Sequence, residues 1–65
     1  MKTLKELNKK YESKHINTFN KNYKTIASGF QYLKNGISWL YYTIDNVNIV
    51  ITTKDNRIID IIESY

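Results

Sequence analysis

The chain has 65 residues, a formal net charge of +4 and no cysteine, so disulfide bonds and thiolate metal sites are excluded. A chain this short buries only about 60% of its unfolded surface, which favours one small domain over residues 1–65 with a thin margin of stability. Short domains that lack disulfides and metals commonly gain stability by associating with another chain.

The positive charge is concentrated in the first part of the chain. Residues 1–24 contain seven lysines and two glutamates, a net charge of +5, whereas residues 25–65 have a net charge of −1. This asymmetry allows two interpretations: the lysines form a solvated face, or they form a surface for an anionic partner. The first ten residues lack the apolar stretch of a signal peptide, and no apolar run approaches the roughly 20 residues of a membrane span. We therefore expect a cytoplasmic protein that makes no membrane contact.

Residues 3–14 are predicted to form a helix. The segment Thr3-Leu4-Lys5-Glu6 has the S/T-x-x-E form of a capping box, with Thr3 as the N-cap. One apolar stripe then recurs at helical spacing, formed by Leu4, Leu7, Tyr11 and His15. The lysines fall mostly outside this stripe, so the helix is expected to be amphipathic.

The next segment, residues 16–29, allows two interpretations. A helix over residues 18–27, capped by Asn17 and ended by Gly29, would carry an apolar stripe of Phe19, Tyr23, Ile26, Ala27 and Phe30. The alternative is a strand from about Tyr23 onward, because Ile26, Phe30 and Tyr32 also alternate with a period of two. We favour the helix.

From Phe30 onward the sequence predicts an antiparallel meander. Asn-Gly and Asp-Asn pairs at 35–36, 45–46 and 55–56 suit two-residue turns, since both turn positions need a positive φ. Strands are expected at 30–34, 37–44, 47–53 and 57–63, although the last segment also has helical spacing. The predicted fold class is α+β, with one or two N-terminal helices packed on an antiparallel meander of three to four strands.

Two-residue turns would fix which side chains share a face of this sheet. Around Asn35-Gly36, Tyr32 would oppose Trp39 and Phe30 would oppose Tyr41. The expected aliphatic face, which would receive the first helix, comprises Leu33, Leu40, Tyr42, Ile44, Val47, Ile49 and Ile51. The expected aromatic face comprises Phe30, Tyr32, Ile37, Trp39, Tyr41, Val50 and Thr52.

The aromatic face allows three interpretations. It could be covered by the second segment and consolidated by cross-strand pairs, which would be purely structural. It could instead be an interface with a second copy or a target protein, since Tyr and Trp are common anchors there. Finally, it could stack on single-stranded nucleic acid. The candidate partner-binding residues are Phe30, Tyr32, Trp39 and Tyr41.

The sequence favours a non-catalytic protein. His15 is the single histidine, and Asp60 and Glu63 would lie on opposite faces of a strand, so neither provides an acid–base pair. No cofactor or metal motif is found. We expect a protein-binding inhibitor or regulator acting by surface contact; small Lys/Asn/Ile-rich chains often come from phages and mobile elements, including anti-defence inhibitors. The alternative is a nucleic-acid-binding protein that uses aromatic stacking and Lys5, Lys9, Lys10, Lys14, Lys21 and Lys24.

Overall fold

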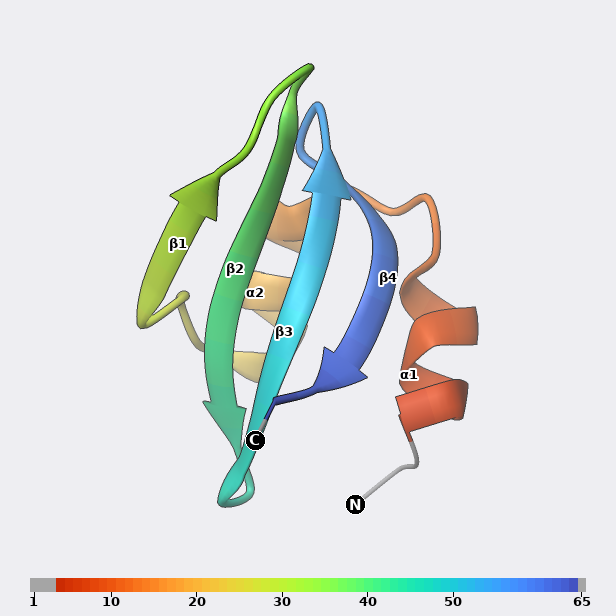
Figure 1. The fold of residues 1–65 in the computed structure, drawn as a ribbon. Coiled ribbons are helices and arrows are strands. Elements are labelled where there is room, and N and C mark those ends of the chain that lie inside the picture. The colour runs from red at the N-terminus through yellow and green to blue at the C-terminus, as the bar shows by residue number, and fades with distance from the viewer. Residues whose placement is uncertain (1–3, 65) are drawn as a thin grey trace.

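The computed structural model describes residues 4–64, which form two helices followed by a four-stranded antiparallel sheet (Figure 1). The elements are α1 (Leu4–Tyr11), α2 (Ile16–Tyr23), β1 (Gly29–Tyr32), β2 (Ile37–Ile44), β3 (Val47–Lys54) and β4 (Arg57–Glu63). The strands lie in the order β1-β2-β3-β4, so each pairs with its neighbour in sequence. The predicted α+β class is confirmed with both helices present, and residues 57–63 form a strand.

The first helix ends earlier than the predicted boundary at residue 14. Its last residue is Tyr11, and Ser13 adopts a positive φ of 68°. The Ser13 N–H then donates to the Ile58 carbonyl of β4 at 2.8 Å, so the chain leaves the helix to pair with the sheet. The predicted N-cap, Thr3, lies outside the described residues.

The second helix forms, but its boundaries differ from the predicted 18–27. It begins at Ile16 because His15, rather than Asn17, provides the cap: His15 Nδ1 accepts a hydrogen bond from the Asn17 N–H at 3.1 Å. It ends before Lys24, whose left-handed backbone (φ 51°) directs its N–H back to the last turn. The interpretation of residues 24–27 as helix was therefore wrong.

The β2–β3 and β3–β4 turns form as the sequence predicts. Both residues of each turn, Asp45-Asn46 and Asp55-Asn56, have φ between 52° and 68°. The β2–β3 register is the predicted one, with Tyr42 opposite Ile49. The β3–β4 register shifts between Thr52 and Thr53, where β4 contributes one extra residue and the sheet bends.

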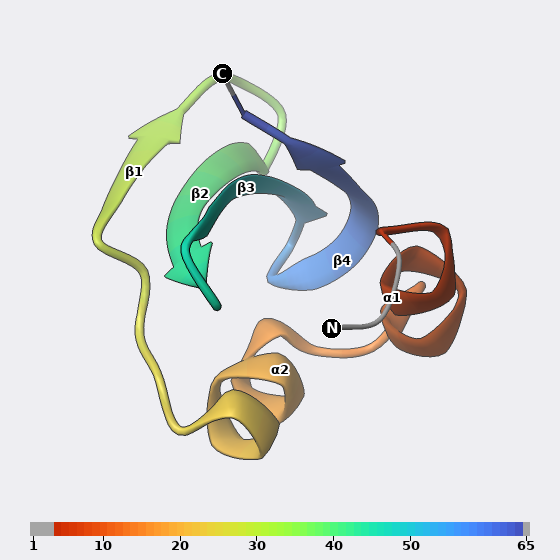
Figure 2. The same cartoon turned by 90° about the horizontal axis from the view of Figure 1, so that it is seen from below.

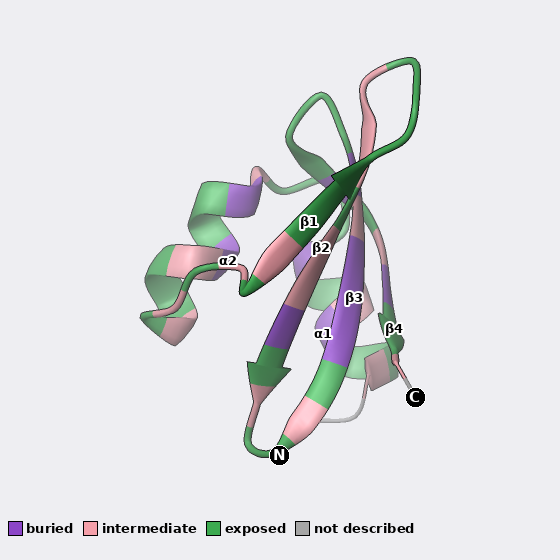
Figure 3. Cartoon of the chain, turned by 60° about the vertical axis from the view of Figure 1, so that its left-hand side comes forward, coloured by how far each residue is buried: buried purple, intermediate pink, exposed green. Residues whose placement is uncertain are grey.

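The core lies between one face of the sheet and the two helices. Figure 2 shows β2, β3 and β4 curving in an arc that opens towards α2, with α1 beside β4. Figure 3 shows that burial is concentrated on β3 and nearly absent from β1. The core cluster comprises Leu7, Tyr11, Ile16, Phe19, Tyr42, Ile49, Ile51, Ile58 and Ile61.

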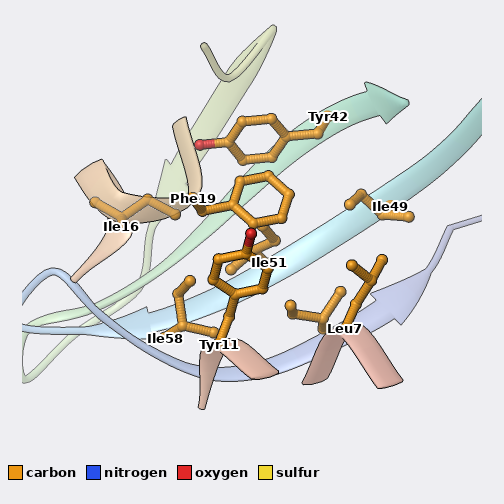
Figure 4. Close-up of a cluster of buried hydrophobic side chains, with 9 residues drawn as sticks. Leu7, Tyr11, Ile16, Phe19, Tyr42, Ile49, Ile51 and Ile58 are labelled. Atoms are coloured by element: carbon orange, nitrogen blue, oxygen red, sulfur yellow. The ribbon is translucent and has the colours of Figure 1, made fainter. Parts of the chain in front are cut away.

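Phe19 is the centre of this core (Figure 4). Its ring lies edge-on to those of Tyr11 and Tyr42, with centroids 5.2 and 5.1 Å away. The hydroxyl groups of the two tyrosines are hydrogen bonded: the Tyr11 hydroxyl accepts from the Asn22 side chain at 3.0 Å, and the Tyr42 hydroxyl donates to Asn20 Oδ1. The aromatic rings therefore join α1, α2 and β2 without leaving these hydroxyl groups unpaired.

The buried position of Tyr42 predicts a loss of stability in alkali. Burial raises the pKa of Tyr42 above its ordinary value of 10.0. Because the folded-state pKa is the higher one, the stabilising contribution is complete below pH 10 and is lost as pH rises through the folded-state pKa. Burial also raises the pKa of Tyr23.

Urea unfolding at a series of pH values from 8 to above 10, on the wild type and on Tyr42→Phe, measures this effect. The free energy of unfolding should fall more steeply above pH 10 in the wild type than in Tyr42→Phe. The variant retains a smaller slope from Tyr23. Parallel pH profiles for the two proteins would contradict the assignment.

Candidate protein-interaction surfaces

The first turn of the sheet contains an extra residue that the sequence did not reveal. Asn35 and Gly36 adopt positive φ angles, and the Ile37 N–H donates to the Lys34 carbonyl at 3.0 Å, as expected for the predicted two-residue turn. However, the Leu33 N–H donates to the Ile37 carbonyl at 2.9 Å. Leu33 and Lys34 therefore both face Ile37, and the register beyond them shifts by one residue.

This shift overturns the predicted pairing of β1. Phe30 lies opposite Leu40, not Tyr41, and Tyr32 lies opposite Ser38, not Trp39. A shift of one residue transfers every side chain of a strand to the other face. Phe30 and Tyr32 therefore point to the side of the sheet that carries the helices, and the predicted four-aromatic face does not form.

Contacts with the β3–β4 turn hold the bulged turn in place. The Asp55 N–H donates to the Gly36 carbonyl at 3.0 Å, and the Gly36 N–H donates to the Tyr32 hydroxyl at 3.3 Å. The two turns lie side by side at the same end of the sheet (Figure 1). The bulged turn therefore makes one local hydrogen bond, to Tyr32, and one to a residue far away in the sequence, Asp55.

The outer face of the sheet, which is turned away from α2, carries the first candidate surface. Its aromatic residues are Trp39 and Tyr41, and the Tyr41 hydroxyl donates to Gln31 of β1 at 3.5 Å. Tyr41, Val50 and Ile62 are paired in a row across three strands. We call Trp39, Tyr41, Val50 and Ile62 the outer patch.

The outer patch is closely packed although no helix covers it. Val50 is only 8% exposed, so the side chains around it on the same face must screen it from water. Trp39 and Ile62 remain 38% and 49% exposed. The sequence placed Val50, Trp39 and Tyr41 on one face, but it did not reveal Ile62 because the bulge in β4 alters the alternation there.

The second candidate surface is the outer margin of the sheet at β1. Phe30 and Tyr32 are 69% and 62% exposed, because α2 ends at Tyr23 and does not extend across this strand. Ile26, in the connection from α2 to β1, is 79% exposed. The predicted helical stripe would have buried Ile26 and Phe30, so that expectation was wrong. We call Phe30 and Tyr32 the edge pair.

The lysines predicted as phosphate contacts do not gather around the outer patch. All six are exposed, and they lie on α1, on α2 or on the segments that follow these helices: Lys5, Lys9, Lys10, Lys14, Lys21 and Lys24. Figure 2 places α2 across the opposite face of the sheet and α1 beside β4. The cationic and aromatic surfaces are therefore separate.

The residues considered for catalysis have structural contacts. Asp60 Oδ1 accepts hydrogen bonds from Asn8 at 2.8 Å and from the Ile61 N–H, which ties α1 to β4. His15 is the cap of α2 described above. Across residues 4–64, we find no pocket, no group of three or more His, Cys, Asp or Glu side chains able to hold a metal, and no helix with the length and apolarity to cross a bilayer.

No protein-family model, no curated protein and no solved structure matches this chain.

Proposed function

We propose that the protein is a non-catalytic binding module that inhibits or regulates a target protein by contact through the outer patch. One observation carries the proposal: Trp39 and Tyr41 flank the buried Val50 on a sheet face that neither helix covers. An apolar surface of this kind on a small protein commonly marks an interaction site.

The arrangement of the outer patch supports a protein partner. Interface hot spots are enriched in Trp and Tyr and lie at the centre of a patch, with polar residues around them. Here the polar residues on the same face include Thr43 and Asn48, which hydrogen bond to each other at 2.8 Å. The patch presents rigid aromatic side chains held by a sheet, so little side-chain entropy is lost on binding.

The charge of the chain indicates the chemistry of the target. The net charge is +4, and the lysines of the two helices are exposed. Lys54, which is also exposed, pairs with Ile37 on the outer face. Positive charge of this kind steers association towards an acidic protein surface and accelerates encounter at low salt. We therefore propose an acidic target protein.

Affinity capture with three versions of the chain tests the proposal. The wild type, the outer-patch variant Trp39→Ala/Tyr41→Ala and the control Phe30→Ala serve as bait for lysate of the source cells, and captured proteins are identified by mass spectrometry. The best candidate is then purified, and its dissociation constant is measured with each version. We expect the outer-patch variant to bind at least about 100-fold more weakly, as for loss of two hot-spot residues.

Phe30→Ala removes an exposed aromatic residue from the other side of the sheet and should bind the purified target as the wild type does. The unfolding free energy of each version shows whether it is folded. Equal affinities for the wild type and the outer-patch variant would contradict the proposal. Salt-sensitive binding to oligonucleotides, with no captured protein that depends on Trp39 and Tyr41, would favour the nucleic-acid alternative instead.

A further inference from the structure

The two edges of the sheet differ in whether their backbone groups are paired. At β4, the Ser13 N–H donates to the Ile58 carbonyl and the Ile58 N–H donates to the Lys14 carbonyl, both at 2.8 Å. The Ile16 N–H also donates to the Asn56 carbonyl at 2.8 Å, and α1 packs beside the rest of the strand. In the described part of the chain, no segment pairs with the outer side of β1.

The direction of the unpaired groups on β1 follows from the bulged turn. Because the Leu33 N–H points to β2 and backbone groups alternate along a strand, Gln31 also faces β2. The N–H and C=O groups of Phe30 and Tyr32 therefore point outward. These outward groups have the spacing that an added antiparallel strand requires.

The edge also lacks the usual protection against strand pairing. Natural edge strands commonly carry lysine, proline or an inward charge. Residues 25–33, with the sequence TIASGFQYL, contain no charged residue and no proline. The edge pair also provides two exposed aromatic side chains, on the two residues whose backbone groups point outward. Both the backbone and the side chains of β1 are thus suited to another extended strand.

We propose that the added strand is β1 of a second copy, paired antiparallel about a twofold axis at Gln31. Phe30 of each copy then lies opposite Tyr32 of the other, which forms four backbone hydrogen bonds and two aromatic cross-strand pairs in a continuous eight-stranded sheet.

A second copy fits this edge because its own β1 is equally uncharged, exposed and, within residues 4–64, unpaired on the outer side, and one register about Gln31 pairs both outward residues of each copy. The interface is isologous, as twofold dimers require. Lys34 falls opposite Ser28 of the second copy, so the basic residue nearest to β1 does not meet its own counterpart. This dimer uses residues outside the outer patch and leaves that patch free for a target.

Sedimentation equilibrium of the purified protein over a range of concentrations tests the dimer. The wild type should dimerise, and Phe30→Lys should raise the dimer dissociation constant at least about tenfold, since it places a charge in the new sheet. Ile62→Lys is the matched control, because it puts the same charge on an exposed apolar position of β4 and should leave the dimer intact. A monomeric wild type, or equal dimerisation by Phe30→Lys, would overturn the proposal.

A disulfide bond tests the register of the dimer directly. At the twofold axis, the Gln31 Cα atoms of the two copies would lie about 4.5 Å apart, within the range of a disulfide. Gln31→Cys should therefore form a covalent dimer under mild oxidation, whereas Thr43→Cys, on the exposed outer face of β2, should not. Equal cross-linking of both variants, or of neither, would contradict the pairing. Target capture is a separate measurement. A monomeric protein would therefore leave the target-binding proposal intact, and failure to capture a target would leave the dimer proposal intact.

Discussion

Phe19→Ala is expected to destabilise the fold by about 3–5 kcal/mol, the usual cost of removing a fully buried phenyl ring. The Phe19 side chain is 0% exposed, and its ring contacts those of Tyr11, Tyr23 and Tyr42 at centroid distances between 4.7 and 5.2 Å. A domain of this size has a total stability of about the same magnitude. The variant should therefore be largely unfolded at room temperature.

Urea unfolding followed by circular dichroism measures this cost. Phe30→Ala is the matched control: it makes the same substitution at a residue that is 69% exposed in the single chain, and at protein concentrations where the chain is monomeric its effect should stay within about 0.5 kcal/mol. If Phe19→Ala has no folded baseline, Phe19→Leu removes less volume and keeps the difference measurable. Similar costs at positions 19 and 30 would mean that Phe19 is not the centre of the core.

Gly36→Ala is expected to cost about 1–3 kcal/mol, because the backbone of the bulged turn favours glycine and the Asp55 side chain would have to move away from an added Cβ. The φ of Gly36 is +80°, where an L side chain is strained. An added Cβ would also overlap Asp55 Oδ1 in the neighbouring turn. Both effects act at the place where the register of β1 is set, so the substitution should also weaken the β1–β2 pairing.

Two further variants separate these contributions in the same unfolding measurement. Gly29→Ala should be close to neutral, because its Cβ would meet Tyr41 Cδ2 at an ordinary distance of 3.8 Å. In an Asp55→Gly background, Gly36→Ala should cost less, since the overlap with the carboxylate is gone and only the strained φ remains. An equal cost at positions 29 and 36 would contradict the described turn.

Turn residues and alternating apolar residues correctly predicted the pairing of β2 with β3. Asp45-Asn46 joins two strands of equal length, and the predicted pairing of Tyr42 with Ile49 and of Leu40 with Ile51 is confirmed. Alternating apolar residues in these strands leave one register that buries Ile49 and Ile51. The aliphatic face was correct from Leu40 to Ile51, whereas Leu33 is 38% exposed.

The candidate site could be predicted only in part, since its geometry depends on long-range contacts. Asn35-Gly36 predicts a two-residue turn, and this turn forms, but the extra residue beside it occurs together with a long-range contact to Asp55 that no local sequence pattern indicates. Because of that one extra residue, Phe30 and Tyr32 lie on the opposite face of the sheet from Trp39 and Tyr41. Similarly, the end of α2 depends on the backbone of Lys24, a residue type with no strong signal for a left-handed conformation.

The assignment of two separate surfaces depends on the register of β1 against β2, which nuclear Overhauser contacts between Hα protons measure directly. The structure predicts a contact between Phe30 Hα and Leu40 Hα, and one between Tyr32 Hα and Ser38 Hα. These contacts place the edge pair and the outer patch on opposite faces. Hα contacts from Gln31 to Leu40 and from Leu33 to Ser38, the close pairs in the register around a plain two-residue turn, would instead place all four aromatic residues on one face and contradict the account.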